Sequence, residues 1–331
     1  MKLGFVPLLF GRPVIQTSAV QGRFSYRTPL MSGGGGSLPS VSSSSLGVVI
    51  SGSTKGVGRA LAEEFVKQND GVVISSRTPD SVDSTVASLR RQYPTARVFG
   101  CVADVSKHLD VARLADFASE NLGTINTFIC NAGTTGPRGP IRDAEANDLA
   151  NVVSTNLLGP MLCAKEAWRV AKNQSQPLHV FIMDGSGSRG NTTPNYAAYG
   201  ATKRSIPQLV ASLAIEGKGD PVRFHTLSPG MVLTDLLLAE NQEPIARKVF
   251  NFLAEEPETV AENLVPRIRS VVRSDKSKTY IQFLTIPKAF FQLATGFVLG
   301  LRGNKFFDNR TGQRIAQTGH FKRNGVRIKE D

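Results

Sequence analysis

Tyr199 and Lys203 lie four residues apart in the segment Tyr-Gly-Ala-Thr-Lys. On a helix this spacing places both side chains on one face, so the lysine ammonium can lie beside the phenol. A free tyrosine titrates at about 10, and a nearby positive charge favours the phenolate, which brings the pKa toward the range useful for proton transfer at neutral pH. The pair is therefore a candidate proton donor with a tuning cation. The alternative is an ordinary surface pair on a helix.

A second candidate group is the segment Ser-Gly-Ser-Thr-Lys-Gly-Val-Gly at 51–58, which contains Gly52, Gly56 and Gly58. An apolar run at 46–50 precedes it, and a helical pattern of apolar residues follows it. Strand, glycine turn and helix form the first unit of a dinucleotide-binding fold. There Gly52 would make the tight turn, Gly56 would let a pyrophosphate approach the main chain, and Gly58 would let the helix pack on the strand. The alternative is a simple turn, because the spacing differs from Gly-x-Gly-x-x-Gly.

The elements that must hold these groups alternate in type along the chain. After the glycine segment, apolar runs typical of strands occur at 72–75, 98–102, 127–130, 179–183 and 223–227. Helical patterns separate them at 80–92, 111–121, 149–172 and 199–216. The alternation predicts an α/β fold, a doubly wound Rossmann-type parallel sheet in a single domain with a C-terminal extension. Ligands bind beyond the carboxyl ends of such strands, so the residues that directly follow each run are the candidate site.

The residues at these strand ends form a set of motifs: the glycine segment, Ser76-Arg77, Asp104-Val105, Asn131-Ala132-Gly133, Asp184-Gly185-Ser186 and Ser228-Pro229-Gly230. In this order and spacing, and with the Tyr-x-x-x-Lys pair, the set resembles the short-chain dehydrogenase/reductases over about residues 47–240. The resemblance implies a nicotinamide cofactor. It assigns cofactor binding to Gly52, Ser53, Lys55, Gly56, Val57, Gly58, Ser76, Arg77, Asp104, Val105, Asn131, Ala132, Gly133, Tyr199, Lys203, Pro229, Gly230, Val232 and Thr234.

The same resemblance implies a catalytic set. Tyr199 would donate a proton, while Lys203 would lower the pKa of the tyrosine and bind the nicotinamide ribose. The family's carbonyl-polarising serine lies thirteen residues before the tyrosine, which selects Ser186, with Ser188 as the second candidate in the same turn. Both serines can also be plain turn residues. Asn156 in Ser-Thr-Asn-Leu-Leu-Gly-Pro matches the asparagine with which the family holds a water in a proton relay. The alternative is that Asn156 is a polar helix residue whose side chain bonds only to backbone.

One feature departs from the family pattern. Pro207 follows Lys203 by four residues and lacks the amide that would bond the Lys203 carbonyl. A kink in the helix is expected there, with an effect on where Lys203 lies.

Charge at the second strand end predicts which cofactor is bound. NAD-dependent members place an acid there for the ribose 2′-hydroxyl, whereas this chain has Ser76-Arg77, with Lys55 inside the glycine segment. Two cations and no carboxylate suit a 2′-phosphate, which predicts NADPH, and the family pattern puts Asp104 and Val105 near the adenine. The alternative for Arg77 is a solvated loop charge.

Further segments narrow the resemblance: Met-Asp-Gly-Ser-Gly-Ser, Ser-Pro-Gly-Met-Val-Leu-Thr-Asp, a later Pro-Glu-Thr-Val-Ala-Glu-Asn-Leu and a terminal Phe-Phe-Asp. To about residue 308 they resemble the chlorophyll(ide) b reductases of the NON-YELLOW COLORING and NYC-like (NOL) type. This implies NADPH-dependent reduction of the C7 formyl group of chlorophyll b or chlorophyllide b to a hydroxymethyl group, with no metal, in a chloroplast at the thylakoid surface. The partners implied are the pigment, the thylakoid membrane, light-harvesting complexes, and a homo-oligomer or a complex with a related reductase.

Two other functions are possible on these motifs. One is a plastid 3-ketoacyl-carrier-protein reductase or general carbonyl reductase, against which the long segment after residue 240 argues. The other is a non-catalytic NADPH-binding scaffold for pigment-breakdown enzymes, against which the Tyr199 and Lys203 pair argues.

Composition divides the chain into three parts. The net charge is +12, but residues 1–46 carry four bases and no acid, and residues 302–331 carry eight bases and three acids, which leaves only +3 for the rest. A basic groove for nucleic acid is therefore not expected.

The chain is expected to have three segments. The acid-poor, serine-rich segment 1–45 predicts a plastid transit peptide or a disordered linker, and residues 46–279 are predicted to form the catalytic domain. Residues 280–331 form an apolar and then basic extension, either a packed helix and loop, a lid over the pigment, or a membrane attachment.

The three cysteines, Cys101, Cys130 and Cys163, lie in apolar runs without the spacing of a zinc site. They are expected to be buried, reduced thiols. The chain has no uninterrupted run of eighteen apolar residues, so an integral helix bundle is not expected.

Overall fold

The computed structural model describes residues 45–238, 244–299, 305–308, 310–311 and 313–315. The chain divides into two units, Met1–Ser40 and Val41–Asp331, and all described residues belong to the second unit. The predicted transit segment 1–45 therefore lies, apart from Ser45, outside the described residues.

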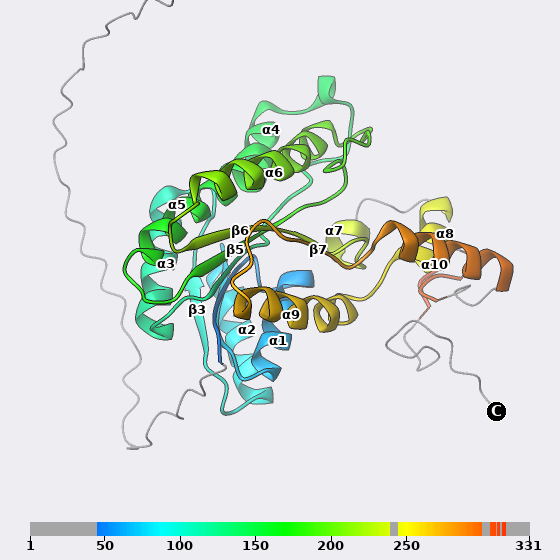
Figure 1. Cartoon of the computed structure of the whole chain (residues 1–331). Helices are drawn as coiled ribbons and strands as arrows, with labels where there is room; N and C mark the ends of the chain where they lie inside the picture. The colour runs from blue at the N-terminus through cyan, green and yellow to red at the C-terminus, as the bar shows by residue number, and fades with distance from the viewer. Residues whose placement is uncertain (1–44, 239–243, 300–304, 309, 312, 316–331) are drawn as a thin grey trace, which may run out of the picture. The chain divides into compact units, whose positions relative to one another are not determined.

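A seven-stranded parallel sheet forms the centre of the second unit (Figure 1). Its strands are β1 (Gly47–Ser51), β2 (Gly71–Ser76), β3 (Val98–Val102), β4 (Thr127–Cys130), β5 (Leu178–Met183), β6 (Val222–Ser228) and β7 (Tyr280–Gln282). Their order in the sheet is β3-β2-β1-β4-β5-β6-β7. The strand order reverses between β1 and β4, where ligands bind in doubly wound sheets. The predicted fold class is confirmed.

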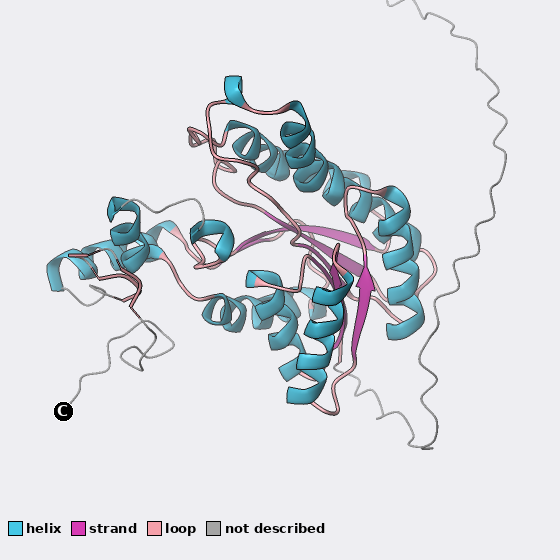
Figure 2. Cartoon of the chain, turned by 180° about the vertical axis from the view of Figure 1, so that it is seen from behind, coloured by secondary structure: helices cyan, strands magenta, loops and turns pink. Residues whose placement is uncertain are grey.

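Helices cover both faces of the sheet, as Figures 1 and 2 show from opposite sides. They are α1 (Gly56–Lys67), α2 (Pro79–Gln92), α3 (His108–Leu122), α4 (Ala146–Val153), α5 (Gly159–Ala171), α6 (Ala197–Glu216), α7 (Asp235–Leu238), α8 (Pro244–Leu253), α9 (Pro257–Arg273) and α10 (Ile286–Leu299). A 3-10 turn, Ile141–Asp143, precedes α4. In the described part of the chain, no helix is both long and apolar enough to span a bilayer.

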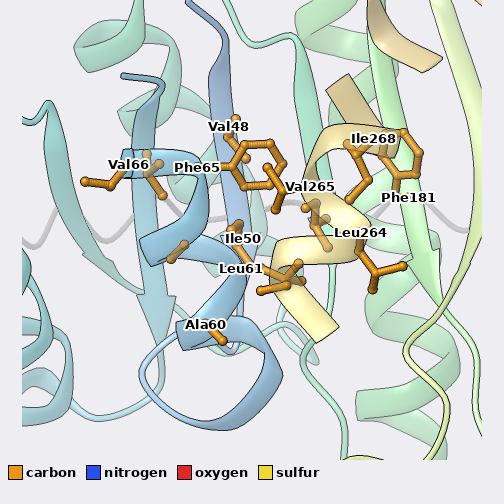
Figure 3. Packing of buried hydrophobic residues seen from close by; sticks show 14 of the residues in the cluster. Val48, Ile50, Ala60, Leu61, Phe65, Val66, Phe181, Leu264, Val265 and Ile268 are labelled. Carbon is orange, nitrogen blue, oxygen red and sulfur yellow. The ribbon is translucent and has the colours of Figure 1, made fainter. Parts of the chain in front are cut away.

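The two faces of the sheet bury separate hydrophobic clusters because strand side chains alternate in direction. On β1, Val48 and Ile50 belong to the cluster with α1, α2 and α9, whereas Val49 belongs to the cluster with α3, α5 and α6. Figure 3 shows the first cluster, in which Phe65 of α1 and Val265 of α9 lie against the sheet. This packing holds the start of α1, and with it the glycine segment, against the carboxyl end of β1.

The structure refines three features of the sequence analysis. The helical pattern predicted over 149–172 is divided, since α4 and α5 are joined by one π-helical turn at Ser154–Leu158. Helix α6 continues through Pro207, so the proline does not end it. The extension predicted from residue 280 begins with β7, which pairs with β6 as the edge strand of the sheet.

Candidate active site

Tyr199 and Lys203 lie on α6 and reach the turn that follows β5. A Cβ atom placed on Gly185 would stand 2.3 Å from the Tyr199 hydroxyl and 3.3 Å from Cε of Lys203. The Lys203 Nζ lies 5.8 Å from the centroid of the Tyr199 ring and donates a hydrogen bond of 3.0 Å to the carbonyl oxygen of Met183. The two side chains predicted to share a helix face therefore meet over the carboxyl end of β5.

Burial shifts the proton equilibrium of the lysine. Lys203 is only 6% exposed, and loss of hydration lowers its pKa from 10.5 to about 8, although the nearby carboxylate of Asp184 acts in the opposite direction. At neutral pH the side chain is therefore still a cation, and it becomes neutral as the pH rises past about 8. A charge buried this deeply acts strongly on its neighbours, because little water screens it.

Asn156 lies in the π-helical turn and connects two segments of the site. Its Oδ1 accepts the main-chain N–H of Thr134 at 2.8 Å, and its Nδ2 donates to the Thr134 carbonyl at 2.7 Å and to Thr202 Oγ1 at 3.2 Å. Thr202 in turn donates to the carbonyl oxygen of Tyr199 at 2.7 Å. The asparagine is thus bonded to backbone, and these bonds tie the loop after β4 to the helix that carries Tyr199. Single π turns in α-helices are frequent at functional sites.

The two candidate serines differ in environment. Ser186 directly follows Gly185 and is exposed, and its hydroxyl accepts a long hydrogen bond of 3.4 Å from Asn191. Ser188 is 6% exposed, and its hydroxyl donates to the carboxylate of Asp184 at 3.3 Å. The proton of Ser188 is therefore already directed into the protein, whereas that of Ser186 can still be donated to a substrate.

The glycine segment forms a tight turn at the end of β1. Gly52 and Gly56 adopt φ angles of +65° and +55°, which side-chain-bearing residues rarely adopt. A Cβ on Gly58 would stand 2.4 Å from Asn131 Nδ2 and from the Gly52 carbonyl, so α1 can approach this closely only with glycine there. Asn131 holds the turn, since its Nδ2 donates to the carbonyls of Ser51 and Gly52 at 3.0 and 2.9 Å.

Several other predicted residues surround this turn. Ser53 is buried and ties the turn to its neighbours, since its hydroxyl donates to the Ile50 carbonyl and accepts the Ser75 N–H. A Cβ on Gly56 would stand 3.1 Å from Cγ2 of Thr234, so the segment after β6 reaches the glycine turn. Val57, Ser76, Ala132 and Gly133 are at or next to the strand ends that surround it. These residues come from four strand ends and meet at one edge of the sheet.

Two cations and one acid lie at the ends of the first three strands and in the glycine segment. Lys55 and Arg77 are both exposed. Burial opposes the ionisation of Asp104, yet its pKa is lowered, because Ser106 donates two hydrogen bonds to it and the positive charge of Arg77 is near. Arg77 is therefore close to the end of β3 as well as to the end of β2.

The remaining predicted residues have mainly structural contacts. Val105 is buried against Gly159 at the start of α5. Gly230, which follows Pro229, has a φ of +73° and packs on Leu284. Val232 is buried and pairs with Glu255 through its backbone.

Three residues of the site were not assigned a role from the sequence. Asp184 is at one of the predicted strand ends, but one of its hydrogen-bond donors comes from a distant part of the chain. Its carboxylate accepts the hydroxyl of Tyr280 at 2.5 Å, across 96 residues of sequence. Thr134 carries the backbone groups that hold Asn156. Of these residues, only Asp184 could have been found from the sequence, because it lies at a predicted strand end.

A doubly wound sheet, a glycine turn at the end of its first strand, and a Tyr-x-x-x-Lys pair over the fifth together define a short chain dehydrogenase. The profile of the short chain dehydrogenase family matches residues 47–244. The chain belongs to this family, and the predicted membership is confirmed.

Curated relatives narrow the similarity. The chain is 42% identical over 264 residues to a protein named chlorophyll(ide) b reductase NOL, chloroplastic, from Oryza sativa subsp. japonica, which covers 78% of this chain and 77% of the relative. It is 44% identical to the protein of that name from Arabidopsis thaliana, over 78% of this chain and 76% of the relative. The predicted resemblance to this group is confirmed.

A solved structure supports the fold alone. The 3-ketoacyl-(acyl-carrier-protein) reductase from Brucella melitensis in complex with NADH superposes with a TM-score of 0.63 at 22% identity, over 71% of this chain and 95% of that one.

Proposed function

We propose that this protein reduces the C7 formyl group of chlorophyll b or chlorophyllide b to a hydroxymethyl group. The observation that carries the proposal is the contact of the Tyr199 hydroxyl and the Lys203 side chain with Gly185 at the end of β5, two strands along the sheet from the glycine turn after β1. Identities of 42% and 44% to relatives named chlorophyll(ide) b reductase support the choice of substrate. The general carbonyl reductase alternative has less support, since the zebrafish carbonyl reductase family member 4 is 29% identical to this chain.

NADPH is the cofactor that these residues fit best. Gly52 and Gly58 let the turn and α1 pack closely on Ala132 and Asn131, and Gly52 and Gly56 adopt positive φ angles. The turn formed in this way places the start of α1 at the end of β1, where main-chain N–H groups can bind a pyrophosphate. Arg77 and Lys55 are exposed beside this turn and would bind the 2′-phosphate. When bound, the cofactor supplies the hydride for the formyl carbon.

The side chains of the site supply the proton and orient the carbonyl. Tyr199 donates its phenolic proton to the formyl oxygen, and the Lys203 ammonium stabilises the phenolate that remains. Ser186 donates a hydrogen bond to the same oxygen as it gains charge, because its hydroxyl faces solvent beside Gly185. Asn156 bonds Thr134 and Thr202 and so ties the loop after β4 to the helix that carries Tyr199.

An absorbance assay tests the proposal. Purified protein mixed with NADPH and chlorophyllide b should convert the pigment spectrum to that of the 7-hydroxymethyl product. Tyr199→Phe should abolish turnover and leave NADPH binding unchanged, while Tyr93→Phe, whose hydroxyl bonds Glu63 far from the site, should behave as the wild type. Turnover of acetoacetyl substrates alone would support the 3-ketoacyl alternative. Binding of NADPH with no turnover of either substrate would support the scaffold.

We further propose that the protein acts in the chloroplast on the thylakoid surface, which it contacts through α10. On this helix Ile286, Phe290 and Phe291 are 70%, 73% and 68% exposed. Pro287 and Ala294 are exposed as well, so the exposed residues that the structure describes on this helix are all uncharged. The opposite side of α10 packs on α8, where Gly296 lies against Phe252. An apolar helix face of this kind binds in the interfacial layer of a bilayer.

Cosedimentation with thylakoids or galactolipid vesicles tests the attachment. The double substitution Phe290→Ser and Phe291→Ser should release the protein into the supernatant without loss of chlorophyllide b reduction in solution. The control is Leu109→Ser. Leu109 is 76% exposed on α3, and no other large hydrophobic side chain of that helix is exposed. Unchanged sedimentation of the double variant would place the membrane contact elsewhere.

We also propose that the protein forms a homo-oligomer through α4 and α5. Val153, Leu158 and Met161 are 45%, 41% and 41% exposed on these consecutive helical segments. Met161→Asp should lower the mass found by sedimentation equilibrium, and an unchanged mass would exclude this face.

A further inference from the structure

Asp184 is a buried acid at the carboxyl end of β5. Its side chain is only 4% exposed, and its carboxylate accepts hydrogen bonds from Ser188 at 3.3 Å and from Tyr280 at 2.5 Å. Ser228, at the end of β6, also bonds it. Isolated carboxylates are rarely buried, so a set of donors from three parts of the chain indicates that this one is held in place for a purpose.

The side chain of Lys203 runs directly past this acid. Its Nζ bonds the carbonyl of Met183, which immediately precedes Asp184, and its Cε faces Gly185, which immediately follows. Two ionisable groups from other elements act on the lysine, namely the Asp184 carboxylate and the Cys130 thiol of β4. A hydrogen bond with Cys163, together with burial, raises the pKa of the Cys130 thiol, so the thiol is neutral and Asp184 is the acid of the two that can carry the counter-charge.

We propose that Asp184 is a positioning residue of the reductase site, whose charge keeps Lys203 protonated beside Tyr199. The inference rests on the proposed function, because it assigns Asp184 a role through the lysine that serves the proton donor. Asp184 touches neither substrate nor cofactor in this scheme. Tyr280 and Ser188 both donate their hydroxyl groups to Oδ2 of Asp184, and these hydrogen bonds favour its charged form.

The same arrangement explains why one of two neighbouring serines is available to a substrate. The Ser188 hydroxyl donates to Asp184, and the Ser188 carbonyl accepts a hydrogen bond of 3.1 Å from Arg204. The turn from 184 to 188 is therefore fixed at both ends, with Ser186 exposed between them.

Asp184→Asn tests the role of the charge, because asparagine keeps the shape and an accepting oxygen. Burial lowers the pKa of Lys203 to about 8 while Asp184 opposes this shift, so the variant should lose the lysine proton about one pH unit lower. Affinity for NADPH, followed by nicotinamide fluorescence against pH, should then be about fivefold weaker than wild type at pH 8, about tenfold weaker above pH 9 and close to it at pH 6. Asp220→Asn is the matched control, since Asp220 accepts Trp168 Nε1 at 2.9 Å away from the site.

A readout without any ligand separates this inference from the proposed function. A lysine with a depressed pKa makes the free energy of unfolding rise with pH between its folded and unfolded values, here about 8 and 10.5. In Asp184→Asn the onset of that rise should move below pH 8, whether or not chlorophyllide b is the substrate. An onset at the wild-type pH, with an unchanged pH profile of NADPH binding, would overturn the proposal.

If Asp184→Asn fails to fold, Tyr280→Phe decides the matter. Burial raises the pKa of Asp184 and the Tyr280 hydroxyl opposes this, so removing the hydroxyl should raise the pKa further. A larger neutral fraction of Asp184 lowers the pKa of Lys203, so NADPH binding should begin to weaken at a lower pH on the alkaline side than in the wild type. An alkaline side identical to that of the wild type would contradict a role for the Asp184 charge.

Discussion

The hydroxyl of Tyr199 lies against the main chain of Gly185, so close that a Cβ on the glycine would be 2.3 Å from the phenol oxygen. Real Cβ atoms do not come this close to a hydroxyl oxygen. Either residue 185 or Tyr199 must therefore move if the glycine is replaced. The glycine after β5 thus sets the place where a proton can be delivered.

Gly185→Ala should therefore displace Tyr199 and lower kcat for formyl reduction by about a hundredfold, since small misplacements of a catalytic group have effects of this size. Binding of NADPH should change far less, because the glycine turn after β1 is untouched. The matched control is Gly139→Ala, where an added Cβ meets nothing within 4 Å. Wild-type kcat in Gly185→Ala would show that the phenol does not need this position.

Replacement of Arg77 tests the cofactor preference. Arg77→Ala should weaken NADPH binding by about tenfold through loss of a charge-assisted bond, and should leave NADH binding unchanged. Arg91→Ala, another exposed arginine at the far end of α2, is the control. Equal losses for both dinucleotides would mean that Arg77 contributes only a general positive field.

Asn251 of α8 binds the main chain of Phe306 and Phe307 through hydrogen bonds. It accepts the main-chain N–H groups of Phe306 and Phe307 at 2.8 and 2.9 Å and donates to the Phe307 carbonyl at 2.7 Å. Asn251→Ala leaves these buried groups without those partners and should lower the free energy of unfolding by about 3 kcal/mol. Urea denaturation measures this, with Asn263→Ala on the exposed face of α9 as the control. A loss as small as that of the control would mean that water replaces these bonds.

Acid should destabilise the protein through two buried histidines. His179 and His225 are fully buried and joined by a hydrogen bond of 3.0 Å, and burial lowers their pKa values to about 4 and about 3. Unfolded imidazoles bind protons near 6.5, so the unfolded state binds more protons below that pH. The free energy of unfolding should therefore fall as the pH drops from about 6.5 to 4, by up to about 1.4 kcal/mol per pH unit for each histidine.

Removing one of these histidines should reduce that slope. His225→Leu takes away one group that can bind a proton, so its pH dependence should be shallower by about one proton. Thr279→Val, which removes only the hydroxyl that bonds His225 at 2.9 Å, should keep the wild-type slope. Equal slopes in His225→Leu and wild type would show that acid unfolding has another cause.

Much of the fold could be predicted from the sequence because the responsible signals are local. Apolar runs such as 127–130, which alternate with helical patterns, are typical of strands buried on both faces. The four-residue spacing of Tyr199 and Lys203 places them on one face of any helix. The division of the predicted 149–172 helix at Asn156 was missed, since a π turn depends on what its side chains bond across the site. β7 was missed as part of the sheet, because three residues carry too little pattern to identify a strand.

The order of strand and helix, the glycine turn, and the pairing of a phenol with an ammonium were determined by the sequence itself, because each depends on residues within a few positions of one another. Tertiary structure alone decided which serine faces solvent and which acid lies beside Lys203. Asp184 receives its donors from Ser188 and from Tyr280, which is 96 residues away, and no local spacing encodes such a contact. Burial of the pair is likewise a property of the packed sheet, and it is this loss of water that brings the pKa of Lys203 to about 8.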